Sequence, residues 1–191
     1  MRCLLCEALS FEQICLECQS LYLKPRLHKR RLKQDLYCYS FYSYREIKDL
    51  LHTKHTDLGY YIYAILAKNS FELFAQGFEH NEQIYALAVD DLPLGGYSHT
   101  ALLAKALTSS YIKPLYGSLR AKNRISYSGK SREFRLLNPR DFECKNVTNR
   151  AVIVVDDIVT TGVTLMEASG AIEAKNGKTL FCLTLADASL H

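Results

Sequence analysis

Apolar positions follow two different periods along this chain, and stretches of the two periods alternate. Short apolar or aromatic runs, typical of strands, occur at 37–44, 84–89, 150–155 and 178–186. Apolar residues at helical spacing lie between them, at 45–55, 57–78, 99–107 and 163–175. A further short strand is expected near 113–119. Strands that alternate with helices predict an α/β domain whose mostly parallel sheet carries helices on both faces.

One apolar run leads directly into residues that can do chemistry. The segment "AVIVVDDIVTTGVT", 151–164, places two adjacent carboxylates after its apolar residues, followed by hydroxyls and a glycine: Asp156, Asp157, Thr160, Thr161, Gly162 and Thr164. In parallel sheets, ligands bind beyond the carboxyl ends of the strands, where the free N–H groups of a following helix attract phosphate. The glycine allows close backbone approach, and the threonines add donors. Two carboxylates suit a vicinal diol or a divalent cation, so the segment predicts a site for a ribose 5-phosphate.

Other interpretations of this segment are weaker. An acidic strand end of the Walker B kind needs a Walker A loop, and the one candidate, at 129–131, has Arg124 where the first glycine must stand. A dinucleotide fingerprint is absent, because the chain has no G-x-G-x-x-G. A purely structural turn stays open, although crowding two carboxylates is costly without a ligand.

Cysteines gather at the start of the chain in two C-x-x-C pairs: Cys3, Cys6, Cys15 and Cys18. Two such pairs can complete a tetrahedral zinc shell, and four thiolates leave no open position, so the metal would be structural. A segment this short cannot fold on its own apolar burial, and metal would supply its stability. A redox pair or unconnected cysteines are the alternatives. Cys38, Cys144 and Cys182 lack such spacing and are expected to be buried thiols.

Basic residues cluster in two stretches. "KPRLHKRRLK", 24–33, carries six Lys/Arg and no acid, and it is interpreted as a connector or as a contact to a phosphate backbone. The stretch 120–140 carries seven Lys/Arg and one acid, Glu133. We interpret it equally as a lid over the phosphate site or as a contact to single-stranded DNA. In the second case Tyr116, Tyr127 and Phe134 are available for stacking with bases. The candidate nucleic-acid residues are Arg26, Lys29, Arg30, Arg31, Lys33, Arg124, Lys130, Arg132 and Arg135.

Composition is that of an ordinary globular chain. Its 191 residues carry a formal net charge of +4 with 48% hydrophobic residues, and the total charge alone does not suggest nucleic acid. No apolar window is long enough to span a membrane, and the N-terminus lacks the apolar core of a signal peptide, so we expect a cytoplasmic protein. The expected organisation is a zinc-binding module at 1–22, a basic linker at 23–36 and the α/β domain at 37–191.

These motifs together resemble a known family. "VIVVDDIVTTGVT" is similar to the phosphoribosyl-pyrophosphate (PRPP) motif of type I phosphoribosyltransferases, and the whole chain resembles the ComF family of competence proteins. "YSYREIKDLLHTKH" resembles that family's aromatic strand, helix and lysine, here Lys54, and "RLLNPRDF" supplies Arg135, Asn138 and Phe142. The chain departs from the family at Gly95, where an arginine is usual, and at 97–99, where Tyr-Ser-His replaces Phe-Asn-Gln. Lys54, Arg120 or His99 are candidates to compensate for the missing cation.

The resemblance implies a type I phosphoribosyltransferase-like fold, a zinc module and a role in natural transformation. It also implies PRPP binding assisted by Mg²⁺, through Asp156, Asp157, Val159, Thr160, Thr161, Gly162, Val163, Thr164, Lys54 and Arg120, with the two aspartates as catalytic candidates. Two functions are open: a binding protein for PRPP and single-stranded DNA, or a phosphoribosyltransferase of unknown acceptor. Other DNA-import proteins are possible partners, with the zinc module as a docking surface.

Overall fold

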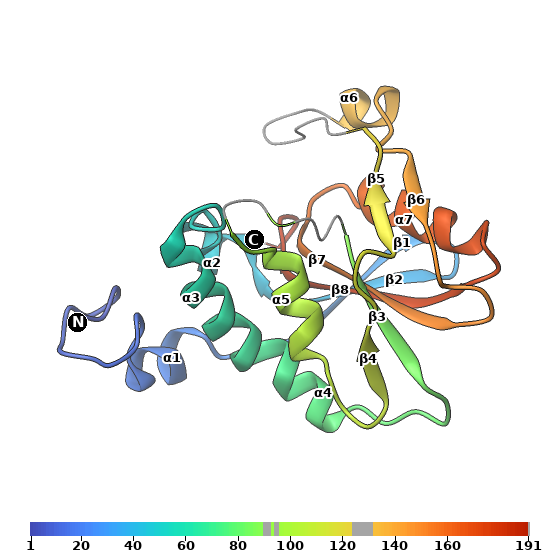
Figure 1. The fold of residues 1–191 in the computed structure, drawn as a ribbon. Coiled ribbons are helices and arrows are strands. Elements are labelled where there is room, and N and C mark those ends of the chain that lie inside the picture. Colours follow the sequence, from blue (N-terminus) through green and yellow to red (C-terminus); the bar gives the residue numbers. More distant parts are fainter. Residues whose placement is uncertain (90–92, 94–95, 124–131, 191) are drawn as a thin grey trace.

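A six-stranded sheet forms the centre of the molecule (Figure 1). The structure is a computed structural model and describes residues 1–89, 93, 96–123 and 132–190. The strands lie in the order β1 (His28–Lys33), β2 (Leu36–Ser43), β8 (Lys178–Asp187), β7 (Ala151–Val159), β3 (Ile84–Ala88) and β4 (Ile112–Pro114). All neighbouring pairs are parallel except β1 with β2. The sheet is therefore mostly parallel, with one antiparallel edge.

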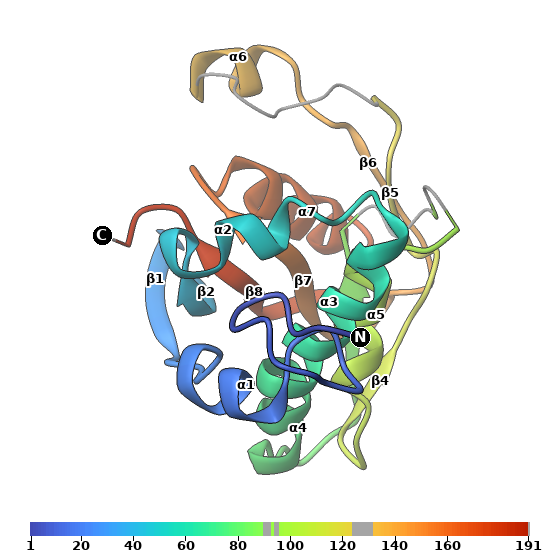
Figure 2. The ribbon, with the colours of Figure 1, turned by 90° about the vertical axis from the view of Figure 1, so that its left-hand side faces the viewer.

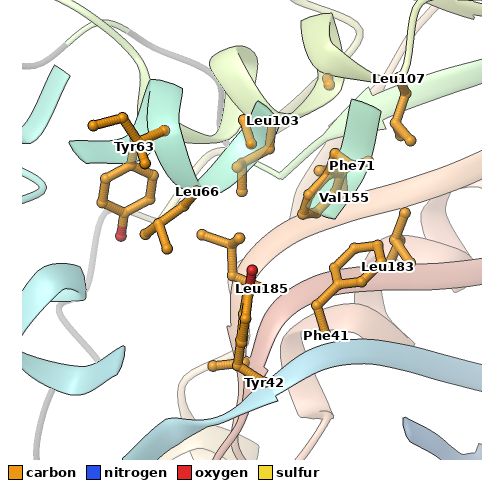
Figure 3. Packing of buried hydrophobic residues seen from close by; sticks show 14 of the residues in the cluster. Phe41, Tyr42, Tyr63, Leu66, Phe71, Leu103, Leu107, Val155, Leu183 and Leu185 are labelled. Carbon is orange, nitrogen blue, oxygen red and sulfur yellow. The ribbon is translucent and has the colours of Figure 1, made fainter. Parts of the chain in front are cut away.

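Helices cover both faces of this sheet. On one face, α2 (Tyr44–Leu51), α3 (Asp57–Ala67) and α5 (His99–Ala106) bury their apolar residues against β2, β7 and β8 (Figure 3). On the other face, α7 (Val163–Glu173) packs against Val152 and Val154 of β7. The central strand β7 is apolar along its first five residues because alternate side chains face two cores. The expected α/β fold class is thus confirmed.

The N-terminal segment, expected to form a separate module at 1–22, packs against the rest of the chain. Its helix α1 (Leu16–Tyr22) begins at Cys15, and Ile14 and Cys18 belong to the same buried cluster as the helices of the first face. Gln19 is buried, and its side-chain oxygen accepts a hydrogen bond from Asn69 Nδ2 at 2.8 Å. Asn69 lies in a π-helical turn, Lys68–Glu72. This turn stands between α3 and α4 (Leu73–Gly77), whereas the sequence predicts a single helix at 57–78.

A small arm projects from the domain and carries part of the second basic stretch. It consists of the antiparallel pair β5 (Leu119–Ala121) and β6 (Phe142–Cys144), with α6 (Arg132–Leu137) at its end. Figure 2 shows this arm well clear of the sheet edge formed by β1. Among the described residues, no helix has both the length and the apolar character needed to cross a membrane.

Two segments differ from expectation in ways that affect the site. The basic segment expected to be a connector contains β1, which pairs with β2 from His28 to Lys33, so four of its six cations belong to the sheet. The strand expected to end before the carboxylates continues to Val159, so Asp156 and Asp157 lie within β7. Both differences arise because backbone pairing with β2 and β8 extends beyond the residues whose side chains signal a strand.

Candidate functional site

Asp157 is the best-connected acid of the site. Its side chain is 9% exposed, and Oδ2 accepts a hydrogen bond from Lys54 Nζ at 2.9 Å. The Tyr63 hydroxyl, from α3, lies 3.3 Å from the same oxygen, and His99 Nε2, at the start of α5, lies 3.6 Å away. Three separate segments thus bring a cation, a phenol and an imidazole to one carboxylate oxygen.

The two acids are held in different electrostatic states. Burial works to raise the pKa of Asp157, but the charges of Lys54 and His99 outweigh it and hold that pKa at about 2. For Asp156, burial and the charge of Asp157 together raise the pKa well above its usual value. The backbone N–H of Asp157 donates to Asp156 Oδ1 at 2.8 Å. The pair therefore combines one firmly ionised carboxylate with one that retains a proton more readily.

Lys54 is held at its backbone as well as at its side chain, which bonds to Asp157. The Tyr97 hydroxyl donates to the Lys54 carbonyl at 2.5 Å. Gly59, at the start of α3, lies so close to Thr53 O and to the Tyr97 hydroxyl that a Cβ there would clash with both. Burial lowers the pKa of Lys54, but the charge of Asp157 and its hydrogen bond produce a net rise. Lys54 is therefore a positioned cation rather than a mobile surface lysine.

The loop after β7 has the backbone shape that phosphate binding requires. Gly162 precedes α7 with φ +79° and ψ 0°, in the left-handed region that favours glycine. Gly162, the residue before α7, has no side chain to cap the helix, while the Val163 N–H donates to Thr161 Oγ1 at 3.5 Å. Val163 is buried, whereas Thr160, Thr161 and Thr164 are half-buried and border the loop. The N–H groups at this end of α7 can therefore serve an anion.

Arg30 contacts this loop from the back. Its Nη1 donates to the Thr160 carbonyl at 2.7 Å and to Asp187 Oδ1 at 2.9 Å. Leu32, two residues along β1, packs against Gly162, because a Cβ at Gly162 would come within 2.7 Å of Leu32 Cδ2. Arg30, which the sequence places among the candidate nucleic-acid residues, is thus joined to the loop after β7.

The other predicted residues fall into three groups. The exposed cations of β1 are Lys29, Arg31 and Lys33, and Lys29 Nζ lies 4.1 Å from the centroid of the Tyr37 ring. Arg120 is exposed on β5, and no hydrogen bond or ion pair within the described part of the chain joins it to the acid pair. Arg26 is exposed next to β1, Arg132 and Arg135 lie on α6, and Arg124 and Lys130, like Gly95 and Tyr127, lie outside the described residues.

The four N-terminal cysteines come together. Their sulfur atoms all lie within 4.8 Å of one another, and Cys6 Sγ is 3.7 Å from Cys15 Sγ. Sulfurs bound tetrahedrally at about 2.3 Å from a central Zn²⁺ would be roughly 3.8 Å apart. Backbone N–H groups of Leu5 and Cys15 also donate to Cys3 Sγ, at 3.5 and 3.3 Å, which favours the thiolate. The donor set and its spacing therefore fit a structural zinc ion.

Sequence reasoning missed part of the site. Tyr63 was not singled out, because a tyrosine on an amphipathic helix has the pattern of an ordinary core residue. Tyr97 was noted only as a departure from the family pattern, and its hydroxyl is the group that holds the Lys54 carbonyl. His99 was named only as a possible substitute cation, and it lies next to Asp157. The signal available in the sequence was the departure at 97–99 itself.

Comparison with known proteins gives remote structural similarities. No model of a known protein family matches the sequence, and no curated protein is similar to it. A hypoxanthine phosphoribosyltransferase from Staphylococcus aureus is 13% identical to this chain, with a TM-score of 0.41. The match covers 65% of this chain and 62% of the Staphylococcus aureus chain, which is less than two thirds of the latter's length. A phosphoribosyltransferase from Corynebacterium diphtheriae has 15% identity and a TM-score of 0.41, over 91% and 83%.

A third structure, orotate phosphoribosyltransferase from Mycobacterium tuberculosis H37Rv in complex with PRPP, has 18% identity and a TM-score of 0.40. The matched region spans 76% of this chain and 66% of that one. These three similar structures are all phosphoribosyltransferases. Because these similarities are remote, function has to be inferred from the chain's own residues.

Proposed function

We propose that this chain is a phosphoribosyltransferase-like protein that binds PRPP. One observation carries the proposal: the acid pair of β7 is followed within a few residues by a left-handed glycine and the uncapped amino end of α7. This arrangement offers carboxylates to the ribose diol on one side and N–H groups to the 5-phosphate on the other. The Thr160, Thr161 and Thr164 hydroxyls add donors to the phosphate side.

The cations near Asp157 suit the opposite end of the ligand. Lys54 Nζ already lies 2.9 Å from Asp157 and could turn toward a pyrophosphate beside the ribose. Mg²⁺, when bound with PRPP, would neutralise the pyrophosphate charge. Asp156 and Asp157 would orient the two ribose hydroxyls and stabilise positive charge that develops at C1. Lys54 and His99 would supply the positive charge of the family arginine that Gly95 replaces in the sequence.

Calorimetry with PRPP, in the presence and absence of Mg²⁺, tests the proposal. We expect binding that is stronger with Mg²⁺, and that is weakened by Thr161→Ala, which removes a hydroxyl from the phosphate side. Thr108→Ala is a matched control, because this threonine is exposed at the end of α5 and bonds only to its own helix. Unchanged affinity in Thr161→Ala, or no binding by the wild-type chain, would show that the assignment is wrong.

The family resemblance and the surface of β1 extend the proposal to cytoplasmic DNA uptake in natural transformation. Lys29 and Arg31 are exposed along β1, with the Tyr37 ring beneath Lys29, and Lys33 is also exposed and pairs with Glu173 of α7 at 3.2 Å. A row of cations beside aromatic rings suits a single-stranded backbone with stacked bases. Log affinity for an oligonucleotide should fall with log salt by about 0.7 per phosphate contacted. Binding that is indifferent to salt, or a strong preference for duplex, would contradict this role.

Turnover of PRPP is a second candidate function, and the acid pair favours it. Adjacent carboxyls whose pKa values are moved in opposite directions are typical of sites in which one group stays ionised and its neighbour handles a proton. Pyrophosphate release, measured with PRPP and a panel of nucleobases, distinguishes the two functions. Release with one acceptor establishes an enzyme, whereas binding without release identifies a PRPP-dependent binding protein.

A further inference from the structure

Strand β1 separates its cations into two sets by simple alternation. Successive side chains of a strand point to opposite faces, and in β1 Arg30 and Leu32 are half-buried while Lys29, Arg31 and Lys33 are exposed. Within the described part of the chain, Arg31 Nη2 donates only to the carbonyl of Gln34, in its own turn. Arg30 instead reaches three residues more than a hundred positions away: Thr160, Asp187 and Ser189. Two neighbouring arginines therefore have different surroundings.

The partner of Arg30 is a buried carboxylate at the end of β8. The Asp187 side chain is 2% exposed, while that of Arg30 is 28% exposed. Asp187 Oδ1 also accepts from the N–H and the hydroxyl of Ser189, each at 2.8 Å. A buried charge of this kind needs its counter-ion, because an unpaired carboxylate there would be strongly destabilising. Arg30 is thus held firmly enough to act as a fixed donor.

That fixed donor is directed at the peptide that links Thr160 to Thr161. The peptide group is planar and trans, so its N–H points away from its carbonyl. Because Nη1 of Arg30 holds the Thr160 carbonyl at 2.7 Å on the β1 side, the Thr161 N–H is directed away from β1. Leu32 supports the next residue, because it fills the space beside Gly162 that a Cβ would need. Strand β1 therefore supports the loop at two consecutive points.

We infer that Arg30 is a positioning residue of the phosphate loop: with Asp187 as its anchor, it orients the Thr160–Thr161 peptide for an anionic phosphate ligand. This inference rests on the proposed PRPP site. It assigns Arg30 a role in binding the phosphate ligand, and leaves contact with nucleic acid to its exposed neighbours Lys29, Arg31 and Lys33. The edge strand that follows the cysteine module thereby becomes part of the ligand site.

The test compares Arg30→Lys with Arg31→Lys, since both variants keep the charge. A lysine at position 30 can still pair with Asp187, but its flexible chain and freely rotating ammonium lack the planar guanidinium that fixes Nη1 against both the Thr160 carbonyl and Asp187. We expect PRPP affinity, measured by calorimetry, to fall about tenfold in Arg30→Lys and to be unchanged in Arg31→Lys. Hydrogen exchange of the 159–164 segment in the absence of ligand should accelerate in Arg30→Lys only, with exchange of β7 and β8 retained.

A second measurement separates positioning from folding. Arg30→Ala and Asp187→Ala should each reduce PRPP affinity, and the double variant should lose no more than Arg30→Ala alone, because both act through one contact. Faster loop exchange together with weaker PRPP binding supports the inference. Unchanged loop exchange and PRPP affinity in a folded Arg30→Lys protein overturns it. If the wild-type chain binds no PRPP, the proposed function fails, while the exchange result still reports on the contact itself.

Discussion

Two clusters of potential anions in this molecule are neutralised in different ways. The four cysteine sulfurs lie within 4.8 Å of one another, and the donors to Cys3 Sγ are backbone N–H groups. Asp157, by contrast, has Lys54 at 2.9 Å and His99 at 3.6 Å on one of its oxygens. The spacing of the first cluster fits a cation from outside the chain, whereas the second cluster has cations from its own chain.

This difference implies different roles. A thiolate cluster without a counter-ion is a folding element, because its stability exists only with metal bound. A carboxylate whose partner is a lysine can exchange that partner for a ligand's hydroxyls while the fold stays intact. The following predictions test this distinction, beginning with the largest expected effect.

Cys18→Ser should have the largest effect. Cys18 is buried in the cluster that joins the module to the domain, so loss of its thiolate removes both the metal and the packing of α1. We expect well under one equivalent of zinc and a loss of several kcal/mol in the free energy of unfolding. Metal analysis and denaturant unfolding measure the two quantities. Cys144→Ser is the control, because this buried thiol lies outside the module, and full zinc loss there would contradict the assignment.

Asp157→Asn should leave the fold intact and weaken PRPP binding. The change removes a charge-assisted hydrogen bond to the ligand, for which we expect a loss of about 1.5–3 kcal/mol in binding free energy. Calorimetry measures this loss. Asp141→Asn serves as a control, because Asp141 is an exposed acid paired with Lys122 at 3.2 Å and should have no effect on PRPP affinity. Equal affinities in the two variants would count against the diol assignment.

Lys54→Met should raise the pKa of Asp157. In the wild-type chain that pKa is about 2, below the ordinary 3.8, so ionised Asp157 contributes stability that is present above about pH 4 and lost as pH falls through about 2. Without Lys54, burial prevails and the raised pKa makes ionised Asp157 destabilising as pH rises through it. The free energies of unfolding of the two proteins should therefore diverge as pH rises above about 2, and continue to diverge above 3.8 until pH passes the raised pKa of the variant.

Charged and titratable groups around Asp157 set the size of this effect. The charge of His99 lowers the pKa of Asp157 in the same direction as Lys54 does, and so does a hydrogen bond with Asp156. Carbon NMR of the aspartate side chains provides a direct measurement. An Asp157 carboxyl that titrates identically in both proteins would show that Lys54 is not its counter-ion.

Tyr97→Phe should have the smallest effect. It restores the residue usual in the resembled family and removes the hydroxyl that donates to the Lys54 carbonyl at 2.5 Å. We expect a cost of about 0.5–1.5 kcal/mol in the free energy of unfolding and a similar or smaller loss of PRPP affinity. Tyr60→Phe is the matched control, since it also removes a tyrosine hydroxyl and Tyr60 is 45% exposed on α3 beside Tyr97. A greater cost at Tyr60 would contradict the role given to Tyr97.

The sequence predicts the strands and helices well where a single physical signal governs them. The apolar run of β7, the acids and the glycine before α7 appear in the structure in that order, because burial and backbone shape determine them locally. The role of β1 could not be predicted, since a run of lysines and arginines has the composition of a linker. Only the pairing of β1 with β2 shows that the side chains of Arg30 and Arg31 lie on opposite faces of a strand. Tyr63 and Tyr97 were missed for a similar reason, because their partners are distant in the chain.

The two edges of the sheet bear on how this protein behaves at high concentration. An unpaired edge strand is a template on which another chain can add, and natural proteins protect such edges with charges or proline. Here β1 presents Lys29, Arg31 and Lys33 at one edge, and β4, at the other, ends in Pro114, which has no N–H to offer. Both ends of the sheet thus resist strand addition, so the protein is guarded against edge-to-edge aggregation.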